Sequence, residues 1–242
     1  MRVSWGDFYP PTPRSAEAFN PDPFEAHALV TSLVRRGERV LEIGPSTGYI
    51  TARLVNELGC SVVAVETSAA AAAATRGRVA VEVIVPPDEL PGAYRATFDV
   101  ILCADVIEHV EAPEAFLRQL LPYLRPGGRL VLSVPNVAHW TVRFDLARGR
   151  FDYEPIGLLA ADHLRFFTRR ALGELLDRLG CRVVSLHGSL GRHHYYRGIV
   201  RRALATQPRL IARLARVWPE LFAFQFVVEA APEAGPARRY FS

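Results

Sequence analysis

Lysine is absent from this chain of 242 residues: all 29 basic residues are arginine, and methionine occurs only at position 1. No lysine can therefore act as a base or a nucleophile. Cysteine is almost as scarce, and Cys60, Cys103 and Cys181 lie in or beside apolar strand patterns. Their odd number and apolar settings predict buried free thiols, not disulfides or metal ligands. Their wide spacing offers no cluster that could hold an iron–sulfur centre.

Long apolar runs are missing as well. No stretch reaches the roughly 18 residues that are needed to span a bilayer, and residues 1–7 lack the apolar core of a signal peptide. The sequence therefore predicts a cytoplasmic protein without a membrane span. The net charge is +4, but the arginines are spread along most of the chain, so nucleic acid is not expected as a partner. A chain of this length fits one α/β domain with a full core.

The most informative stretch is residues 40–48. It reads as a buried strand, Arg39–Ile43, that passes directly into a turn with two glycines and then into a helix at residues 50–58. Glycines in such a turn allow the backbone to approach a ligand closely. This order of elements is the first half of a nucleotide- or nucleoside-binding unit.

A second apolar strand, Ser61–Val65, completes the unit. It ends at Glu66, 22 residues after Gly44. An acidic side chain at that distance is placed to accept hydrogen bonds from the two hydroxyls of a ribose. Strand, glycine turn, helix, strand and acid together predict a nucleoside-binding βαβ unit.

The spacing of the turn indicates which nucleoside is bound. Dinucleotide sites use G-x-G-x-x-G, with a helix N-terminus that faces a pyrophosphate. The pattern here is Glu42-x-Gly44-x-x-x-Gly48. An acid before the first glycine would repel a pyrophosphate but would suit a ligand with positive charge, such as an α-amino group or a sulfonium.

This pattern resembles motif I of the class I S-adenosylmethionine-dependent methyltransferases. Residues 98–110 resemble the fourth-strand motif of that family, and residues 124–134 resemble the turn into its fifth strand. The three motifs occur in the right order over residues 38–135. The resemblance implies S-adenosylmethionine as the cofactor. The residues that are expected to bind it are Glu42, Gly44, Ser46, Gly48, Tyr49, Glu66, Cys103 and Ala104.

The alternation of strands and helices predicts a mostly parallel α/β sheet, with the ligand beyond the carboxyl ends of its strands. The resemblance implies a Rossmann-like sheet of seven strands with the last one antiparallel. Strands are expected at residues 39–43, 61–65, 81–85, 98–103, 129–134, 182–186 and 221–229. Helices are expected at residues 24–36, 50–58, 68–76, 112–123 and 168–179, with further helical patterns at 199–204 and 210–218.

The chain divides around this sheet. Residues 1–23 carry five prolines and read as an irregular arm, residues 24–231 as the methyltransferase domain, and residues 232–242 as a flexible tail. Two segments, 136–167 and 189–220, leave the sheet and carry aromatic residues beside arginines. We expect these insertions to form the acceptor pocket and its lid.

The acceptor chemistry points to histidine. Methyl transfer from a sulfonium is an in-line displacement in which the cofactor supplies the electrophile. A hydroxyl acceptor then needs a base, and histidine is the usual one near neutral pH. His163 and His139 lie after the fifth strand and are the candidate catalytic residues, in that order. Either can instead tie its segment to the sheet, and His27 reads as a structural residue of its helix.

Residues 136–140, 149–153 and 162–168 resemble a bacterial subgroup related to the ubiquinone-type O-methyltransferases. The resemblance implies a small-molecule acceptor, most simply a hydroxyl of a sugar-like or natural-product substrate. Two alternatives stay open: an N-methyltransferase that acts on a small molecule, and an S-adenosylmethionine-binding protein without methyl transfer. The end of the fourth strand lacks the Asn/Asp-Pro-Pro-aromatic motif of enzymes that methylate nucleobase amino groups.

Asp105-x-x-Glu108-His109 resembles the Glu-x-x-Glu-His set with which ubiquinone-type enzymes hold a divalent cation. Two carboxylates and an imidazole can bind a hard cation. Aspartate in place of the first glutamate shortens the reach, and acids at a strand-to-helix junction also complement a helix N-terminus. We therefore expect no metal.

Overall fold

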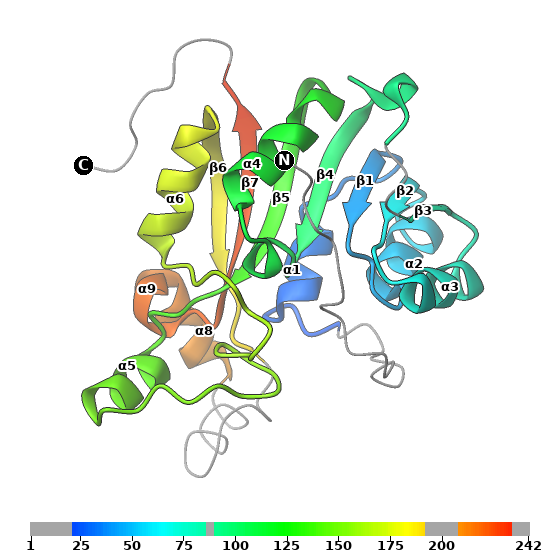
Figure 1. Cartoon of the computed structure of the whole chain (residues 1–242). Coiled ribbons are helices and arrows are strands. Elements are labelled where there is room, and N and C mark those ends of the chain that lie inside the picture. Colours follow the sequence, from blue (N-terminus) through cyan, green and yellow to red (C-terminus); the bar gives the residue numbers. More distant parts are fainter. Residues whose placement is uncertain (1–20, 86–89, 192–207, 234–242) are drawn as a thin grey trace.

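The computed structural model describes residues 21–85, 90–191 and 208–233 (Figure 1). Several sequence-based predictions lie outside these residues. They are the irregular arm up to residue 20, the helical pattern at 199–204, and the tail from residue 234.

A seven-stranded sheet organises the described chain, in the order β3-β2-β1-β4-β5-β7-β6. The strands are β1 (Arg39–Ile43), β2 (Ser61–Val65), β3 (Glu82–Ile84), β4 (Phe98–Ala104), β5 (Leu124–Pro135), β6 (Cys181–Gly188) and β7 (Gln225–Pro232). β7 runs antiparallel to both of its neighbours, β5 and β6, and the other pairs are parallel. The expected mostly parallel sheet with an antiparallel last strand is confirmed.

Helices cover both faces of this sheet (Figure 1). They are α1 (Ala26–Ser32), α2 (Tyr49–Asn56), α3 (Ala69–Arg78), α4 (Pro113–Leu120), α5 (Trp140–Ala147), α6 (Arg169–Arg178), α8 (Pro208–Val217) and α9 (Pro219–Phe222). On one face, α1 and α2 bury Val30 and Leu54; on the other, α4 and α6 bury Phe116 and Leu176. Central strands that are covered on both sides must be apolar almost throughout, which explains the continuous hydrophobic run of β4.

The ends of α6 follow from local chemistry. The Thr168 hydroxyl accepts a hydrogen bond from the backbone amide of Ala171 at 3.1 Å and caps the first turn. Gly180 follows the helix with a φ of 68°, a left-handed conformation that glycine adopts without steric cost. Thr168 therefore starts the helix and Gly180 stops it, as the sequence predicted.

The structure corrects two predicted boundaries. The fifth strand was expected at residues 129–134, but β5 already begins at Leu124 and contains the glycine pair after Pro126, with a register shift where β5 pairs with β4. Residues 221–224 were expected to begin the last strand. Instead α9 ends at Phe222, because Pro219 starts a short helix there, and β7 begins at Gln225.

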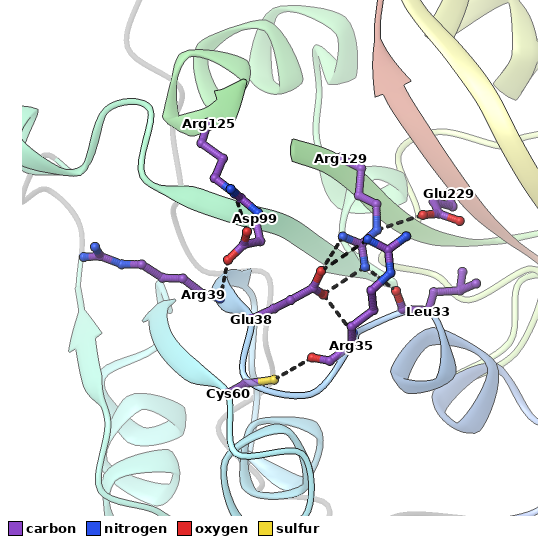
Figure 2. A network of polar contacts seen from close by, with 9 residues as sticks. All are labelled: Leu33, Arg35, Glu38, Arg39, Cys60, Asp99, Arg125, Arg129 and Glu229. Atoms are coloured by element: carbon purple, nitrogen blue, oxygen red, sulfur yellow. Dashed lines mark hydrogen bonds and ion pairs between the residues drawn. The ribbon is translucent and has the colours of Figure 1, made fainter. Parts of the chain in front are cut away.

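A buried charge network lies beside the start of β1 (Figure 2), whereas the motif I loop follows the other end of that strand. The Arg129 guanidinium is 5 % exposed and donates to the Glu38 carboxylate at 2.8 and 2.9 Å. It also forms an ion pair with Glu229 at 2.8 Å and donates to the Leu33 carbonyl at 2.6 Å. This network ties β5 to β7 and to the connection between α1 and β1, so its role is structural.

Cys60, Cys103 and Cys181 are free and buried, as predicted. No helix in the described ranges is long and apolar enough to cross a membrane.

Candidate active site

A cavity of about 560 Å³ lies at the carboxyl ends of the parallel strands. Its wall comes from the loop between β1 and α2, the starts of α1 and α3, the end of β4 with the turn after it, the insertion after β5, Gly191, and the start of β7. Of the residues that the sequence assigned to the site, the following line the cavity: Gly44, Ser46, Tyr49, Ala104 and His163. The pairing of β1 with β4 brings their carboxyl ends together, and the insertion after β5 adds His163.

The motif I loop is held in a left-handed course by three residues with positive φ. Gly44, Ser46 and Gly48 have φ values of 66°, 53° and 76°. A Cβ atom on Gly48 would lie 3.0 Å from the Cα atom of Thr75, so the loop packs directly on α3. The Thr75 hydroxyl also donates to the Ser46 carbonyl at 2.8 Å. Glycine is required at position 48 for both reasons.

Glu66 binds the backbone of this loop in the structure. Its carboxylate accepts hydrogen bonds from the backbone amides of Ser46 at 3.0 Å and Ser68 at 2.9 Å, and the residue is 1 % exposed. The pKa of Glu66 is raised, because the effect of burial exceeds the opposing effect of these amide hydrogen bonds. Glu66 does not line the cavity itself, but Ser46 and Ser68 do.

Glu42, on β1 two residues before Gly44, is also buried and does not line the cavity. One of its carboxylate oxygens, Oε2, has no hydrogen-bond partner among the described residues. Burial raises the pKa of Glu42 to about 7, and the nearby Glu66 charge adds to the rise while the Thr51 hydroxyl opposes it. A buried carboxylate in this state gains most from a nearby positive charge.

The end of β4 supplies the centre of the cavity wall. Ala104 and Asp105 line it, whereas Cys103 is fully buried behind it, and burial raises the pKa of its thiol. Asp105 has a φ of 53°, which is rare for a residue with a side chain. Its Oδ1 atom accepts from the Ser133 hydroxyl at 2.7 Å and from the Gln225 amide at 2.8 Å. Gln225, which the sequence analysis did not single out, also lines the cavity.

His163 reaches the cavity from the insertion after β5. Its Nδ1 atom lies 3.3 Å from the Leu158 carbonyl, and its ring centroid lies 5.0 Å from that of His109. Burial lowers the pKa of His163, and the neighbouring His109 lowers it further. A neutral imidazole that donates from Nδ1 to a carbonyl keeps the Nε2 lone pair as a proton acceptor.

His139, the second candidate base, has a different environment. It is 1 % exposed, does not line the cavity, and precedes α5 as its N-cap residue. Its Nδ1 atom lies 2.8 Å from the Thr141 hydroxyl, and its ring packs on Phe224. Burial lowers the pKa of His139 to about 3. The structure therefore brings only one of the two candidate histidines to the cavity.

Glu108 forms a compact group with His109 and His163. One ligand atom each of Glu108, His109 and His163 lie within 4.8 Å of one another. Both carboxylate oxygens of Glu108 are buried without a hydrogen-bond partner among the described residues. Burial raises the pKa of Glu108 well above its ordinary value, and the nearby Asp105 carboxylate raises it further. Asp105 does not belong to this group.

His27 was expected to be a structural residue of its helix, and the structure also places it in the cavity wall. Its Nε2 atom lies 2.9 Å from the Tyr49 hydroxyl. Periodicity places His27 on α1, but only the packing of α1 beside α2 shows that this part of the helix faces the cavity. No signal in the sequence contains that packing.

The fold and the cavity are those of a doubly wound α/β protein with a ligand site at the carboxyl ends of its parallel strands. The family model for a methyltransferase domain matches residues 23–186, which is more than half of the chain. The chain belongs to this methyltransferase family, and its cofactor is S-adenosylmethionine, as the motifs predicted.

Individual relatives agree with this assignment. The chain is 34% identical over 108 residues to the mitochondrial ubiquinone biosynthesis O-methyltransferase of Schizosaccharomyces pombe, a match that covers 40% of this chain and 38% of that protein. It is 25% identical over 160 residues to the ubiquinone biosynthesis O-methyltransferase of Idiomarina loihiensis, covering 63% and 65% of the two chains. The matches thus span less than two thirds of these relatives.

Solved structures show the same fold. A methyltransferase from Geobacter sulfurreducens, in complex with S-adenosyl-L-homocysteine, aligns with a TM-score of 0.58 at 18% identity. The alignment covers 90% of this chain and 95% of that one. At this identity the likeness concerns the fold alone.

Proposed function

We propose that this protein transfers the methyl group of S-adenosylmethionine to a hydroxyl of a small-molecule acceptor, with His163 as the general base. The observation that carries the proposal is the position of His163, a half-buried imidazole with a lowered pKa that lines the same cavity as the motif I loop and Ala104. A base beside the cofactor is the one catalytic group that oxygen methylation requires from the protein.

The charges around the cavity support a cationic cofactor. Its lining includes four acidic side chains, three of them the carboxylates of Glu25, Asp105 and Asp162 and the fourth Glu108 with its raised pKa, and within the described residues no arginine lines it. A protein with a net charge of +4 thus presents an acidic cavity. Such a cavity attracts a sulfonium and an ammonium group and repels the pyrophosphate of a dinucleotide.

The cofactor is oriented by the strand order. In our proposal, the ribose lies over the end of β2, near Ser68 and the loop that Glu66 holds, and the methyl group lies near Ala104 at the end of β4. Since β1 lies between β2 and β4, an extended cofactor would cross the motif I loop. Glu42, which precedes that loop on β1, then faces the positively charged end of the cofactor.

The proposed chemical step needs one proton transfer. The acceptor hydroxyl gives its proton to Nε2 of His163, while its oxygen attacks the methyl carbon from the side opposite the sulfur. The carbon–sulfur bond breaks, and the electron pair returns to the sulfur, which becomes a neutral thioether. The Leu158 carbonyl holds Nδ1–H and thereby stabilises the imidazolium that forms.

The insertions supply the acceptor side in this proposal. Ile156 and Ala160 line the cavity beside His163, and both belong to the segment 136–167. Gly191, from the start of the second insertion, lines it as well. Their apolar character would exclude water from the methyl group, and His139 would hold the start of α5 in place. A sugar-like or natural-product hydroxyl fits this setting.

The group of Glu108, His109 and His163 could alternatively bind a divalent cation. The two unpartnered oxygens of Glu108 and the close imidazoles fit a hard cation in part. Such an ion would lower the pKa of an acceptor hydroxyl and take over the role of the base. The carboxylate of Asp105, which the ubiquinone-type pattern would enlist, is already held by Ser133 and Gln225.

An acceptor screen with isotopically labelled S-adenosylmethionine tests the proposed function. We expect label in hydroxyl compounds, recovered as methyl ethers. Label on nitrogen would favour the N-methyltransferase alternative. Tight cofactor binding without transfer to any acceptor class would favour a binding protein that does not transfer methyl groups.

A further inference from the structure

His27 and Tyr49 form a hydrogen-bonded pair in the cavity wall. The His27 Nε2 atom lies 2.9 Å from the Tyr49 hydroxyl, the two ring centroids lie 4.8 Å apart, and both residues line the cavity. They come from different helices, α1 and α2, which pack side by side. A contact between two helices that also faces the ligand space can fix the direction of a ligand-binding hydroxyl.

The pair stands where the amino-acid portion of the cofactor is expected. The sulfur carries the ribosyl carbon, the methyl group and the amino-acid portion, so the amino-acid portion branches off between the ribose end at β2 and the transfer position at β4. The strand between these two ends is β1, and its loop leads into α2, whose first residue is Tyr49. Gly48 precedes the helix without a side-chain cap, so the backbone amides at this helix start add partial positive charge.

The amino-acid portion carries a carboxylate, and the cavity is otherwise a poor environment for an anion. Four acidic side chains line it, and none of its described lining residues is an arginine. An anionic group needs a hydrogen-bond donor there, because burying an unpaired charge is costly. Ser46, Thr47 and Ser68 also bring hydroxyls to this wall, and the Tyr49 oxygen is in addition held by a second lining side chain, His27. Tyr49 reaches the cavity from the helix start itself.

We propose that the Tyr49 hydroxyl binds the carboxylate of S-adenosylmethionine and that His27 is the residue that positions it. In this arrangement Nε2–H of His27 donates to the Tyr49 oxygen, and the Tyr49 O–H is directed to the carboxylate. The inference rests on the cofactor placement proposed above, but not on the identity of the acceptor or of the base.

The test compares two cofactors that differ only in the carboxylate. Calorimetry on the full chain measures the dissociation constants of S-adenosylmethionine and of decarboxylated S-adenosylmethionine, which keeps the sulfonium and the amine. Tyr49→Phe removes the hydroxyl and keeps the ring. It should weaken S-adenosylmethionine about tenfold or more, the loss of a hydrogen bond to a charged group, and leave the decarboxylated compound within about twofold.

His27 is tested by its ability to donate. His27→Phe keeps a ring on Tyr49 but cannot donate, so it should cause the same selective loss as Tyr49→Phe. His27→Gln places an amide N–H near the Tyr49 oxygen and should restore most of the affinity. Tyr123→Phe is the matched control, because the Tyr123 hydroxyl bonds to the Leu90 carbonyl away from the cavity, and both affinities should stay unchanged.

The proposal is overturned if Tyr49→Phe weakens the two cofactors equally or weakens neither. If His27→Phe loses affinity but His27→Gln does not restore it, His27 does not position the Tyr49 hydroxyl by donating a hydrogen bond. Failure of the proposed methyl transfer would look different, because turnover would be missing while the carboxylate-dependent difference between the two cofactors remained.

Discussion

The backbone amide of Ser46 donates a hydrogen bond to the carboxylate of Glu66 across 3.0 Å. The acid at the end of β2 and the glycine loop at the end of β1 are therefore one unit before any ligand enters. Each Glu66 oxygen already has a backbone donor, from Ser46 or Ser68. A ribose would add its hydroxyls to a carboxylate whose direction the loop has fixed.

Glu66→Ala should accordingly act on both binding and folding. We expect the affinity for S-adenosylmethionine to fall by about 1–3 kcal/mol, as for hydrogen bonds to a charged group. The free energy of unfolding should fall as well, because two backbone amides lose their acceptor. Calorimetry and denaturant unfolding measure the two effects. Glu57→Ala, which removes an acid at the exposed end of α2, is the control; unchanged affinity in Glu66→Ala would remove Glu66 from the site.

Glu42→Gln should stabilise the protein without ligand at alkaline pH. Because the folded pKa of Glu42 is about 7 and its ordinary value is 4.5, the unfolded chain releases this proton at lower pH than the folded chain. The stability of the wild type therefore falls as pH rises through this window, by about 1.4 kcal/mol per pH unit. At pH 8 the variant should be more stable, by on the order of 3 kcal/mol, and at pH 4 the two should be equal.

Glu42→Gln should also reduce the preference for S-adenosylmethionine over its demethylated product. An ionised Glu42 favours the sulfonium of S-adenosylmethionine over the neutral sulfur of its demethylated product. In the wild type this preference should grow as pH rises through 7, and in Glu42→Gln it should be flat. Titrations of both ligands at three pH values measure it. A pH-dependent preference that survives in the variant would place the titrating group elsewhere.

Gly48→Ala should disturb the protein more than Gly59→Ala, although the backbone strain of the two substitutions is similar. Gly48 and Gly59 have similar φ values, 76° and 66°, so alanine at either position costs about 1–2 kcal/mol in the left-handed region. Only at Gly48 would the new Cβ also meet Thr75, whereas nothing lies within 4 Å at Gly59. We expect Gly48→Ala to lose more stability and to weaken cofactor binding, and Gly59→Ala to leave binding intact.

Chelation should leave methyl transfer largely intact. The pKa of Glu108 is raised well above its ordinary value by burial, which favours a protonated acid over a metal ligand, and Asp105 is engaged by Ser133 and Gln225. Activity is measured before and after treatment with a chelator. If it vanished and returned with magnesium, Glu108, His109 and His163 would be first candidates for ligands, and His163 would not be the free base.

The parts of the fold that local sequence determines were predictable. β1 and β2 have the predicted bounds, and α6 begins after Thr168 and stops before Gly180, because apolar strands, a hydroxyl cap and a left-handed glycine act within a few residues. The boundaries that failed depend on partners. β5 begins before its glycine pair because β4 lies alongside, and α9 replaces the start of the last strand.

The candidate site shows the same division. Gly44, Ser46 and Ala104 could be placed from motif spacing, because strand ends converge by topology. The orientation of Glu66 toward the loop and the exposure of His27 to the cavity could not, since both depend on how side chains from separate helices and loops pack.

The turnover of His163→Ala is the most direct test of the central claim that His163 is the base of a methyltransferase. With an acceptor from the screen, single-turnover rates and cofactor affinity are compared with those of His139→Ala and of His187→Ala, a histidine on β6 outside the cavity lining. We predict that His163→Ala loses about 10²–10⁴-fold in rate at nearly constant cofactor affinity, while His187→Ala matches the wild type. A His163→Ala protein that is folded and turns over at the wild-type rate would contradict the account.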